Sequence, residues 1–180
     1  MVNEILDINK DKYFGTIKEV ETSDRGYFEP DKDRGFFKDF CKRFNIKYQF
    51  GIDHQGKLPD FVLKIDDHFF ILEAKHIKEC GGAQDKQIVE LIEFIKYSEN
   101  PNIHYISFMD GIYFNNFIST SRKNSSKVNT QKEDIEKYLK NNPHNFFVNT
   151  AGLKAIFEDI KNITLVSNLK INEKNRQHNI

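Results

Sequence analysis

The stretch from Leu58 to Lys75 constrains the fold more than any other part of the chain, because two short apolar segments flank a pair of aspartates. A chain reversal at Asp66 and Asp67 predicts an antiparallel hairpin. In that register Asp60 lies directly opposite Glu73, where the Cβ atoms of paired residues are about 4.5–5.5 Å apart. Like charges in such positions are destabilising, so we expect these two acids to serve a purpose other than stability.

The same alternation sorts the side chains of the hairpin onto two faces. One face is apolar throughout and is expected to hold Phe61, Leu63, Ile65, Phe70, Leu72 and Ala74. The other face is expected to hold Asp60, Val62, Lys64, Phe69, Ile71, Glu73 and Lys75. The hairpin therefore predicts two carboxylates and an ammonium group clustered at the end far from the turn.

Two carboxylates at this separation offer the oxygen ligands that a hard divalent cation such as Mg²⁺ takes up. A bound cation would remove the repulsion between Asp60 and Glu73. Lys75 lies two residues beyond Glu73 on the same face, so its ammonium group can reach whatever the metal holds. The alternative is a solvated hairpin that carries a surface Glu/Lys pair. The matching register of all three groups favours the metal site.

Pro59-Asp60, a spacer of twelve residues and then Glu73-Ala74-Lys75 resemble the signature of the PD-(D/E)XK nuclease superfamily, which includes most type II restriction endonucleases. The resemblance implies Mg²⁺-dependent hydrolysis of double-stranded DNA. It implies that Asp60, Glu73 and the main-chain carbonyl of Ala74 hold the metal and that Lys75 orients the attacking water. It also implies products with a 5′-phosphate and a 3′-hydroxyl.

The surrounding pattern predicts an α/β fold in the order αβββαβ. The expected elements are a helix from Pro30 to Asn45, a strand over 48–52, the hairpin, a helix from Ala83 to Tyr97 and a strand from Ile103 to Phe108. The crossover into that last strand can be parallel and right-handed. The same order forms the restriction-endonuclease-like core that the resemblance implies, a central mixed four-stranded sheet flanked by helices.

The chain of 180 residues is long enough for one domain with a sizeable core. We expect a single nuclease domain over 1–180, with its core at about residues 30–110. A helical C-terminal extension and tail are expected over 111–180, with helices at 134–139 and 152–160. A second full domain is not expected.

The segment from Ser119 to Lys132 contains four bases and no acid, together with many hydroxyl and amide groups, which is typical of a flexible loop. Such a loop can contact DNA phosphates through Arg122, Lys123 and Lys127. The alternative is an ordinary solvated linker.

Further candidates for contacts with the metal or the substrate lie near the starts of the two core helices. Glu29 and Asp33 lie near the beginning of the first helix, where a glutamate sometimes adds a metal contact in the resembled family. Gln84 and Gln87 begin the second helix after Gly81-Gly82, and several restriction nucleases have a similar glycine and glutamine run there. The alternative for Glu29 and Asp33 is that acids are favoured at any solvated helix N-terminus. The alternative for Gln84 and Gln87 is an ordinary polar start of a helix.

The formal net charge is zero, with 27 basic and 27 acidic residues, so attraction to nucleic acid must come from local patches. The sequence has no phosphate-binding Gly-Lys-Ser/Thr loop, and we expect no nucleotide cofactor. It shows neither a signal peptide nor a run long enough to cross a bilayer, and Cys41 and Cys80 lack metal-ligand spacing. These features predict a cytoplasmic bacterial protein that does not bind a membrane.

Together with the resemblance, these observations predict an Mg²⁺-dependent, site-specific endodeoxyribonuclease of the type II restriction kind. A homodimer is expected because cutting both strands of a duplex usually takes two such sites. One alternative is a structure-specific nuclease of DNA repair or recombination with the same fold. Another is a non-enzymatic DNA-binding module with a relic site, against which the three intact signature residues argue.

Overall fold

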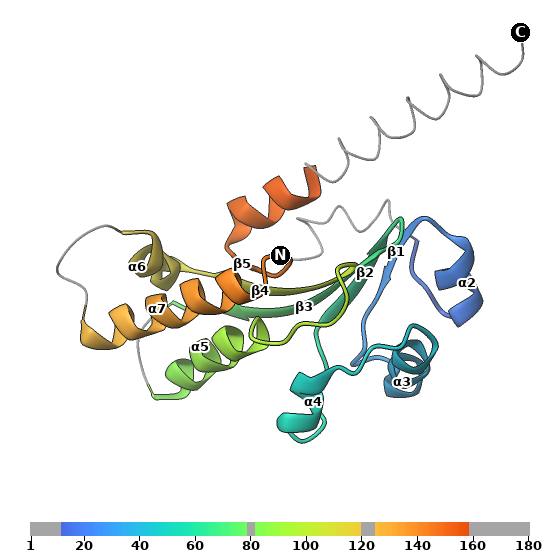
Figure 1. The fold of residues 1–180 in the computed structure, drawn as a ribbon, viewed down its shortest axis with the longest axis horizontal. Helices are drawn as coiled ribbons and strands as arrows, with labels where there is room; N and C mark the ends of the chain where they lie inside the picture. The colour runs from blue at the N-terminus through green and yellow to red at the C-terminus, as the bar shows by residue number, and fades with distance from the viewer. Residues whose placement is uncertain (1–11, 79–81, 120–124, 159–180) are drawn as a thin grey trace, which may run out of the picture.

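A computed structural model describes residues 12–78, 82–119 and 125–158. Its centre is a five-stranded mixed sheet in the order β1-β2-β3-β4-β5, with helices on both faces (Figure 1). The strands β1 (Arg25–Phe28), β2 (Phe61–Ile65) and β3 (His68–His76) pair antiparallel. The strands β4 (Ile103–Asp110) and β5 (Phe146–Val148) continue the sheet from β3 in parallel. The predicted α/β class and mixed sheet are confirmed.

The central hairpin of β2 and β3 forms in the predicted register. Its pairs run from Ile65 opposite His68 at the turn to Phe61 opposite Leu72. Asp66 has a positive φ of 52°, which is the backbone conformation that tight two-residue hairpin turns require. Because β4 pairs with the other edge of β3, β3 lies in the middle of the sheet.

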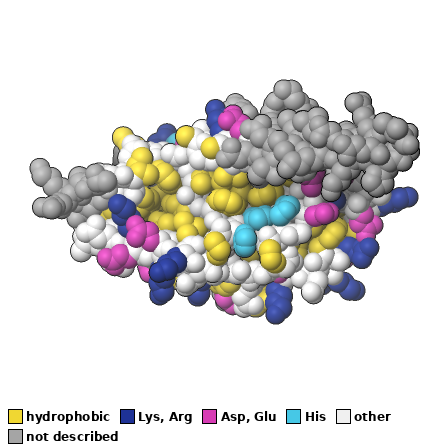
Figure 2. Space-filling view, turned by 45° about the horizontal axis from the view of Figure 1, so that its top comes forward, with side chains coloured by type: hydrophobic (Ala, Val, Ile, Leu, Met, Phe, Trp, Pro, Cys, Tyr) yellow, Lys and Arg dark blue, Asp and Glu magenta, His cyan; other side chains and the backbone are white. Residues whose placement is uncertain are grey.

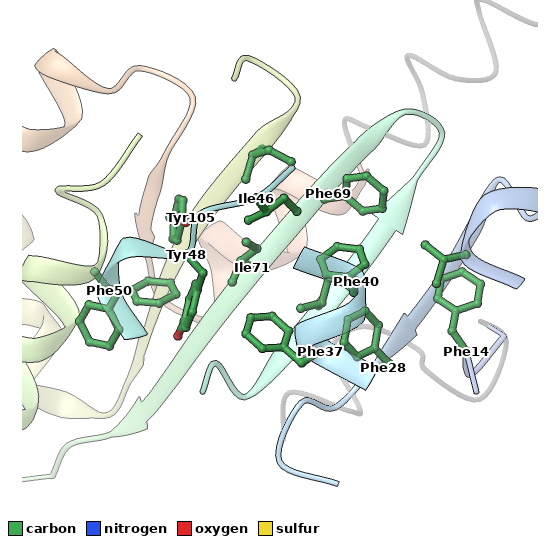
Figure 3. Packing of buried hydrophobic residues seen from close by; sticks show 14 residues of the cluster. Phe14, Phe28, Phe37, Phe40, Ile46, Tyr48, Phe50, Phe69, Ile71 and Tyr105 are labelled. Carbon is green, nitrogen blue, oxygen red and sulfur yellow. The ribbon is translucent and has the colours of Figure 1, made fainter. Parts of the chain in front are cut away.

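The face of the hairpin that carries the acids is covered by three helices, α3 (Arg34–Arg43), α4 (Gln49–Asp53) and α5 (Gly82–Phe94). Figure 3 shows the aromatic side chains of this cluster packed against β3. The buried residues on this side include Phe37 and Phe40 from α3, Phe50 from α4, Phe94 from α5, and Val62, Phe69, Ile71 and Tyr105 from the sheet.

The opposite face of the sheet is apolar as predicted and packs against helical residues 150–158. This cluster contains Leu63, Ile65, Phe70, Leu72, Ile106 and Phe108 from the sheet, with Leu153 and Phe157 from the helix. Figure 2 looks onto this side of the molecule and shows hydrophobic side chains with a group of histidines beside them. Both faces of β2 and β3 are therefore covered.

A third cluster lies beyond α5, where α7 (Ser126–Asn141) packs against it. The short helices η2 (Ile112–Phe114) and α6 (Asn115–Ile118) close this cluster at one end of the sheet. The remaining helix, α2 (Ile17–Thr22), packs beside α3 at the opposite end (Figure 1). In the described part of the chain, no helix has the length and apolar character needed to cross a bilayer.

The predicted strand at 48–52 is wrong, and with it the four-stranded αβββαβ order. Tyr48 has a positive φ of 47° and precedes the short helix α4. Alternating aromatic residues there indicated a strand, but Phe50 is buried from a helix instead. The strand that pairs with β2 in place of the predicted one is β1, which lies before α3 in the chain. The strand β5 adds a further strand at the other edge of the sheet.

The predicted loop from Ser119 to Lys132 is also wrong over its second half. The helix α7 begins at Ser126, because the Ser125 hydroxyl accepts a hydrogen bond from the N–H of Val128 and caps the helix. Val128 and Gln131 are buried on one side of it. The helix predicted at 134–139 is the C-terminal part of α7, and residues 120–124 lie outside the described ranges.

Gly111 fixes the end of β4 against the segment that follows β3. Its φ is +109°, and a Cβ atom added there would lie 2.2 Å from the carbonyl oxygen of Ile77. We expect Gly111→Ala to lower the free energy of unfolding by at least about 2 kcal/mol, since both backbone strain and a steric clash oppose the side chain. Urea denaturation measures this loss. Gly15→Ala is the matched control, because the nearest atom to its added Cβ is 3.7 Å away; equal losses in the two variants would contradict the prediction.

Candidate functional site

Asp60 lies in a bend just beyond the last residue pair of β2 and β3. Its N–H donates to the carbonyl of Leu72 at 3.0 Å, and its Oδ2 accepts a hydrogen bond from the N–H of Ala74 at 2.7 Å. The alternation predicted that Asp60 pairs directly with Glu73 in the hairpin. This prediction is wrong, because strand pairing ends at Phe61 and Leu72. Its side chain takes the place of a backbone partner at the edge of β3, which holds the carboxylate beside Glu73 and Ala74.

Glu73 lies on β3 and is 3 % exposed. Its Oε1 accepts a hydrogen bond from Nζ of Lys75 at 2.5 Å. Its Oε2 is buried and has no hydrogen-bond partner among the described residues. A buried carboxylate oxygen without a donor is costly, so this atom is positioned for a partner that the described chain does not supply.

The charges of Asp60, Glu73 and Lys75 act on one another. The pKa of Glu73 is raised to about 7, mainly by burial and next by the negative charge of Asp60, while Lys75 opposes both effects. Burial also raises the pKa of Asp60, and the N–H of Ala74 opposes that rise. Burial alone would lower the pKa of Lys75, but the nearby Glu73 and Asp60 raise it overall. Desolvation thus outweighs the ion pair at Glu73, and Lys75 stays charged.

The residues at this site fit a hard divalent cation. Glu73 offers an unpartnered oxygen, and Asp60 uses only one of its two oxygens to brace Ala74. The Ala74 carbonyl leaves the strand at the same edge as its N–H, because a strand residue directs both groups to one side. Within the described ranges no third His, Cys, Asp or Glu joins such a group. Two carboxylates, a carbonyl and waters suit Mg²⁺, which keeps several of its waters when bound to protein.

The acids predicted near the first helix serve local roles. Glu29 accepts a hydrogen bond from Nζ of Lys32 at 2.8 Å. Asp33 caps α3 by accepting the N–H of Phe36 at 2.9 Å. The acid of this segment that acts on the site is Asp31, whose charge contributes to the raised pKa of Asp60.

The other predicted residues divide between α5, α7 and the undescribed segment. Gln84 and Gln87 lie in the first turns of α5, and the Gln84 Oε1 is buried without a hydrogen-bond partner in the described chain. Lys127 lies in the first turn of α7 and forms an ion pair with Asp85. Arg122 and Lys123 lie outside the described residues.

Sequence reasoning missed two residues beside the acids, Tyr48 and Lys57. Lys57 forms an ion pair with Glu90 of α5, and its charge lowers the pKa of both Asp60 and Glu73. Burial raises the pKa of Tyr48, and the charge of Glu73 adds to that rise. The sequence predicts a strand at Tyr48, and neither Tyr48 nor Lys57 carries a sequence signal for a site.

A basic pocket of about 250 Å³ lies beside these residues, lined by α3, α4 and the segments that flank α4. Tyr48 and Lys57 are shared between this pocket and the acidic cluster. Every charged residue in its lining is basic: Arg34, Lys38, Lys47 and Lys57. The charged residues of this lining are therefore all basic in a protein of zero net charge, and one of them, Lys57, is paired with Glu90.

Histidines form two hydrogen-bonded groups away from the acidic face. The ring nitrogen Nδ1 of His76 lies 2.8 Å from Oδ2 of Asp110, whose other oxygen accepts a hydrogen bond from Thr150. Nδ1 of His68 lies 2.8 Å from Nε2 of His104. These contacts join the ends of strands. His68, at the hairpin turn, is exposed and still contacts His104 through its ring nitrogen.

Comparisons of the chain with models of protein families, with curated proteins and with solved structures find no match to any of them.

The raised pKa of Glu73 makes the stability of the metal-free protein depend on pH. Its carboxyl has an ordinary pKa of 4.5 and a folded pKa of about 7. Its favourable contribution is therefore fully present below 4.5 and is lost as the pH rises through about 7. Between about pH 5 and pH 8 in EDTA, we expect the parent to lose on the order of 1–3 kcal/mol more unfolding free energy than Glu73→Gln.

Urea denaturation across this pH range measures that difference. Glu136→Gln, which removes an exposed carboxylate on α7, should follow the parent. A Glu73→Gln variant that loses as much stability as the parent would show that Glu73 does not carry the shifted titration.

Proposed function

We propose that the protein is an Mg²⁺-dependent endonuclease that hydrolyses the phosphodiester bonds of double-stranded DNA. The observation that carries the proposal is the buried, unpartnered Oε2 of Glu73, which lies in one cluster with Asp60 and Lys75. Two neighbouring carboxylates, one of them buried with an oxygen that has no partner in the described chain, are suited to bind a cation. The Pro-Asp and Glu-Ala-Lys motifs that resemble the PD-(D/E)XK signature meet in this cluster.

The chain's own residues would divide the work as follows. Asp60, Glu73 and the carbonyl of Ala74 would hold the cation, and Asp60 keeps its orientation through the N–H of Ala74. When bound, Mg²⁺ neutralises charge on the phosphate and lowers the pKa of a bound water. Lys75 is charged, half-buried and next to Glu73, so its ammonium group can hold the attacking water and stabilise it as hydroxide.

The basic pocket supports a proposal for how DNA is held. Lys57 of this pocket acts on the charges of both acids, and Arg34, Lys38 and Lys47 add positive charge that can offset the repulsion between the acids and DNA phosphates. The loop residues Arg122, Lys123 and Lys127 remain candidates, but Lys127 already pairs with Asp85, as Lys57 of the pocket pairs with Glu90. We therefore place the main phosphate contacts at the pocket.

The type II restriction reading implies a homodimer and a single recognition sequence. A repair or recombination nuclease with the same site would instead require a branched or damaged substrate. Digestion of plasmid DNA, of linear duplexes and of four-way junctions separates these readings, because only the first yields fixed fragments from an unbranched duplex. A relic site would yield no cleavage from any of them.

The three signature residues should each be required for cleavage. We expect Asp60→Asn, Glu73→Gln and Lys75→Ala to lower plasmid cleavage in Mg²⁺ by at least about 100- to 1,000-fold, because each removes a charge that acts on the reacting phosphate or water. EDTA should abolish cleavage by the parent. Glu136→Gln and Lys154→Ala change exposed residues and should cleave normally. Near-normal turnover in any of the three site variants would refute the assignment.

Neutralising the pocket should weaken DNA binding and flatten its dependence on salt. We expect the triple variant Arg34→Gln/Lys38→Gln/Lys47→Gln to reduce the slope of log affinity against log salt by about one unit for each lost phosphate contact. Fluorescence anisotropy with a labelled duplex in Ca²⁺, which supports binding with little cleavage, measures this slope. The control triple variant at Lys137, Lys140 and Lys154, which are exposed lysines elsewhere, should change it less. A larger effect from the control, or from changing Arg122, Lys123 and Lys127, would contradict the pocket.

A further inference from the structure

Tyr48 is held in a backbone conformation that aromatic residues rarely adopt. Its φ of 47° and ψ of 57° place it in the left-handed region, where a bulky side chain is strained. Such strain persists only where the surrounding structure enforces it, and it is concentrated at functional sites. The strain at Tyr48 therefore indicates a role for its side chain.

The neighbours of Tyr48 fix both its backbone and its ring. The carboxylate of Glu99 accepts hydrogen bonds from the N–H groups of Lys47 at 2.8 Å and Tyr48 at 3.1 Å. The ring packs edge-on against Phe37, with centroids 5.0 Å apart. A Cβ atom on Gly51 would lie 2.6 Å from this ring, so the glycine leaves the space that the ring occupies. The side chain is thus held in one position from several sides.

The hydroxyl at the end of this fixed ring has no hydrogen-bond partner within the described ranges. Tyr48 is 5 % exposed, and its hydroxyl is buried with no hydrogen bond to any residue that the structure describes. Figure 3 shows the hydroxyl end of Tyr48 directed toward the C-terminal end of β3, where Glu73 follows Ile71. The charges of Glu73 and Asp60 both act on this hydroxyl. The Tyr48 hydroxyl and Oε2 of Glu73 are therefore a buried donor and a buried acceptor that both lack a hydrogen-bond partner in the described chain.

The surroundings of the hydroxyl favour a role as a hydrogen-bond donor. Burial and the two acids raise the pKa of Tyr48, so it stays protonated and neutral near neutral pH and cannot act as a base. A lysine in its place would pair with the acids and compete with a cation, whereas a neutral hydroxyl does not. The group that such a donor suits is an anionic oxygen brought to the acids by a ligand.

We propose that Tyr48 is a further residue of the cleavage site and that its hydroxyl donates a hydrogen bond to a phosphate oxygen of the bound DNA strand. The inference rests on the proposed function. It assigns the ligand class, a phosphodiester, to an atom outside the three signature residues. Tyr48 also lines the basic pocket, so it connects the proposed phosphate contacts with the acids.

The test is Tyr48→Phe, which removes the hydroxyl and keeps the packed ring. Because the lost hydroxyl has no partner in the described chain, the melting temperature of the free protein should be unchanged or higher. Cleavage in Mg²⁺ should fall by about 10- to 1,000-fold, and affinity for a duplex in Ca²⁺ should fall as well. The matched control is Tyr113→Phe, which removes a buried hydroxyl that donates to Gln131 at 3.2 Å and should melt lower while it cleaves normally.

The outcomes separate this inference from the proposed function. A parent that cleaves DNA and a Tyr48→Phe variant that cleaves and binds equally well would overturn the role of Tyr48 alone. A lower melting temperature with unchanged cleavage would also overturn it, because the hydroxyl would then hold a structural water. A parent that cleaves no DNA in Mg²⁺ would overturn the proposed function together with the inference.

Discussion

The burial of one carboxylate, that of Glu73, is the constraint on which the arrangement around β3 depends. Transfer of a charged group out of water costs several kcal/mol unless partners compensate for the loss. Lys75 compensates at one oxygen, while the other has no partner in the described chain and Asp60 adds a second negative charge nearby. The neighbouring positions on this face, Ile71 and Phe69, are apolar and fully packed. An apolar residue would suit stability better at Glu73 than a carboxylate does.

The hairpin that carries this carboxylate could be predicted from sequence because its register has one solution. A shift of one residue would exchange the two faces of β2 and β3, and a two-residue turn at Asp66 and Asp67 allows no other pairing. The same reasoning located Glu73 and Lys75 on one face. It placed Asp60 directly opposite Glu73 and could not foresee that strand pairing ends at Phe61 and that the Asp60 side chain bonds to Ala74.

The errors fall where tertiary contacts override a short local pattern. Four residues of β1 and three of β5 are too short to show alternation, and each becomes a strand only by pairing with a longer neighbour. The helix α7 buries the polar residue Gln131, so its inward face has little apolar periodicity at its start. Tyr48 and Phe50 alternate like a strand, but the left-handed backbone at Tyr48 and the contact with Gly51 make a helix there. None of these strands and helices is determined by residue type alone.

Departures from local rules coincide at the C-terminal end of β3. Elsewhere in the described chain, acids such as Glu29 and Glu19 pair with lysines at ordinary distances. Beside Glu73, by contrast, two like charges lie together, a carboxylate oxygen and a tyrosine hydroxyl lack partners, and an aromatic residue has a strained backbone. A chain in which local preferences agree with the fold is expected to break them only where function requires it. A cation would relieve the repulsion between the acids and bind the unpartnered oxygen of Glu73, and a phosphate oxygen would accept a hydrogen bond from the unpartnered hydroxyl of Tyr48.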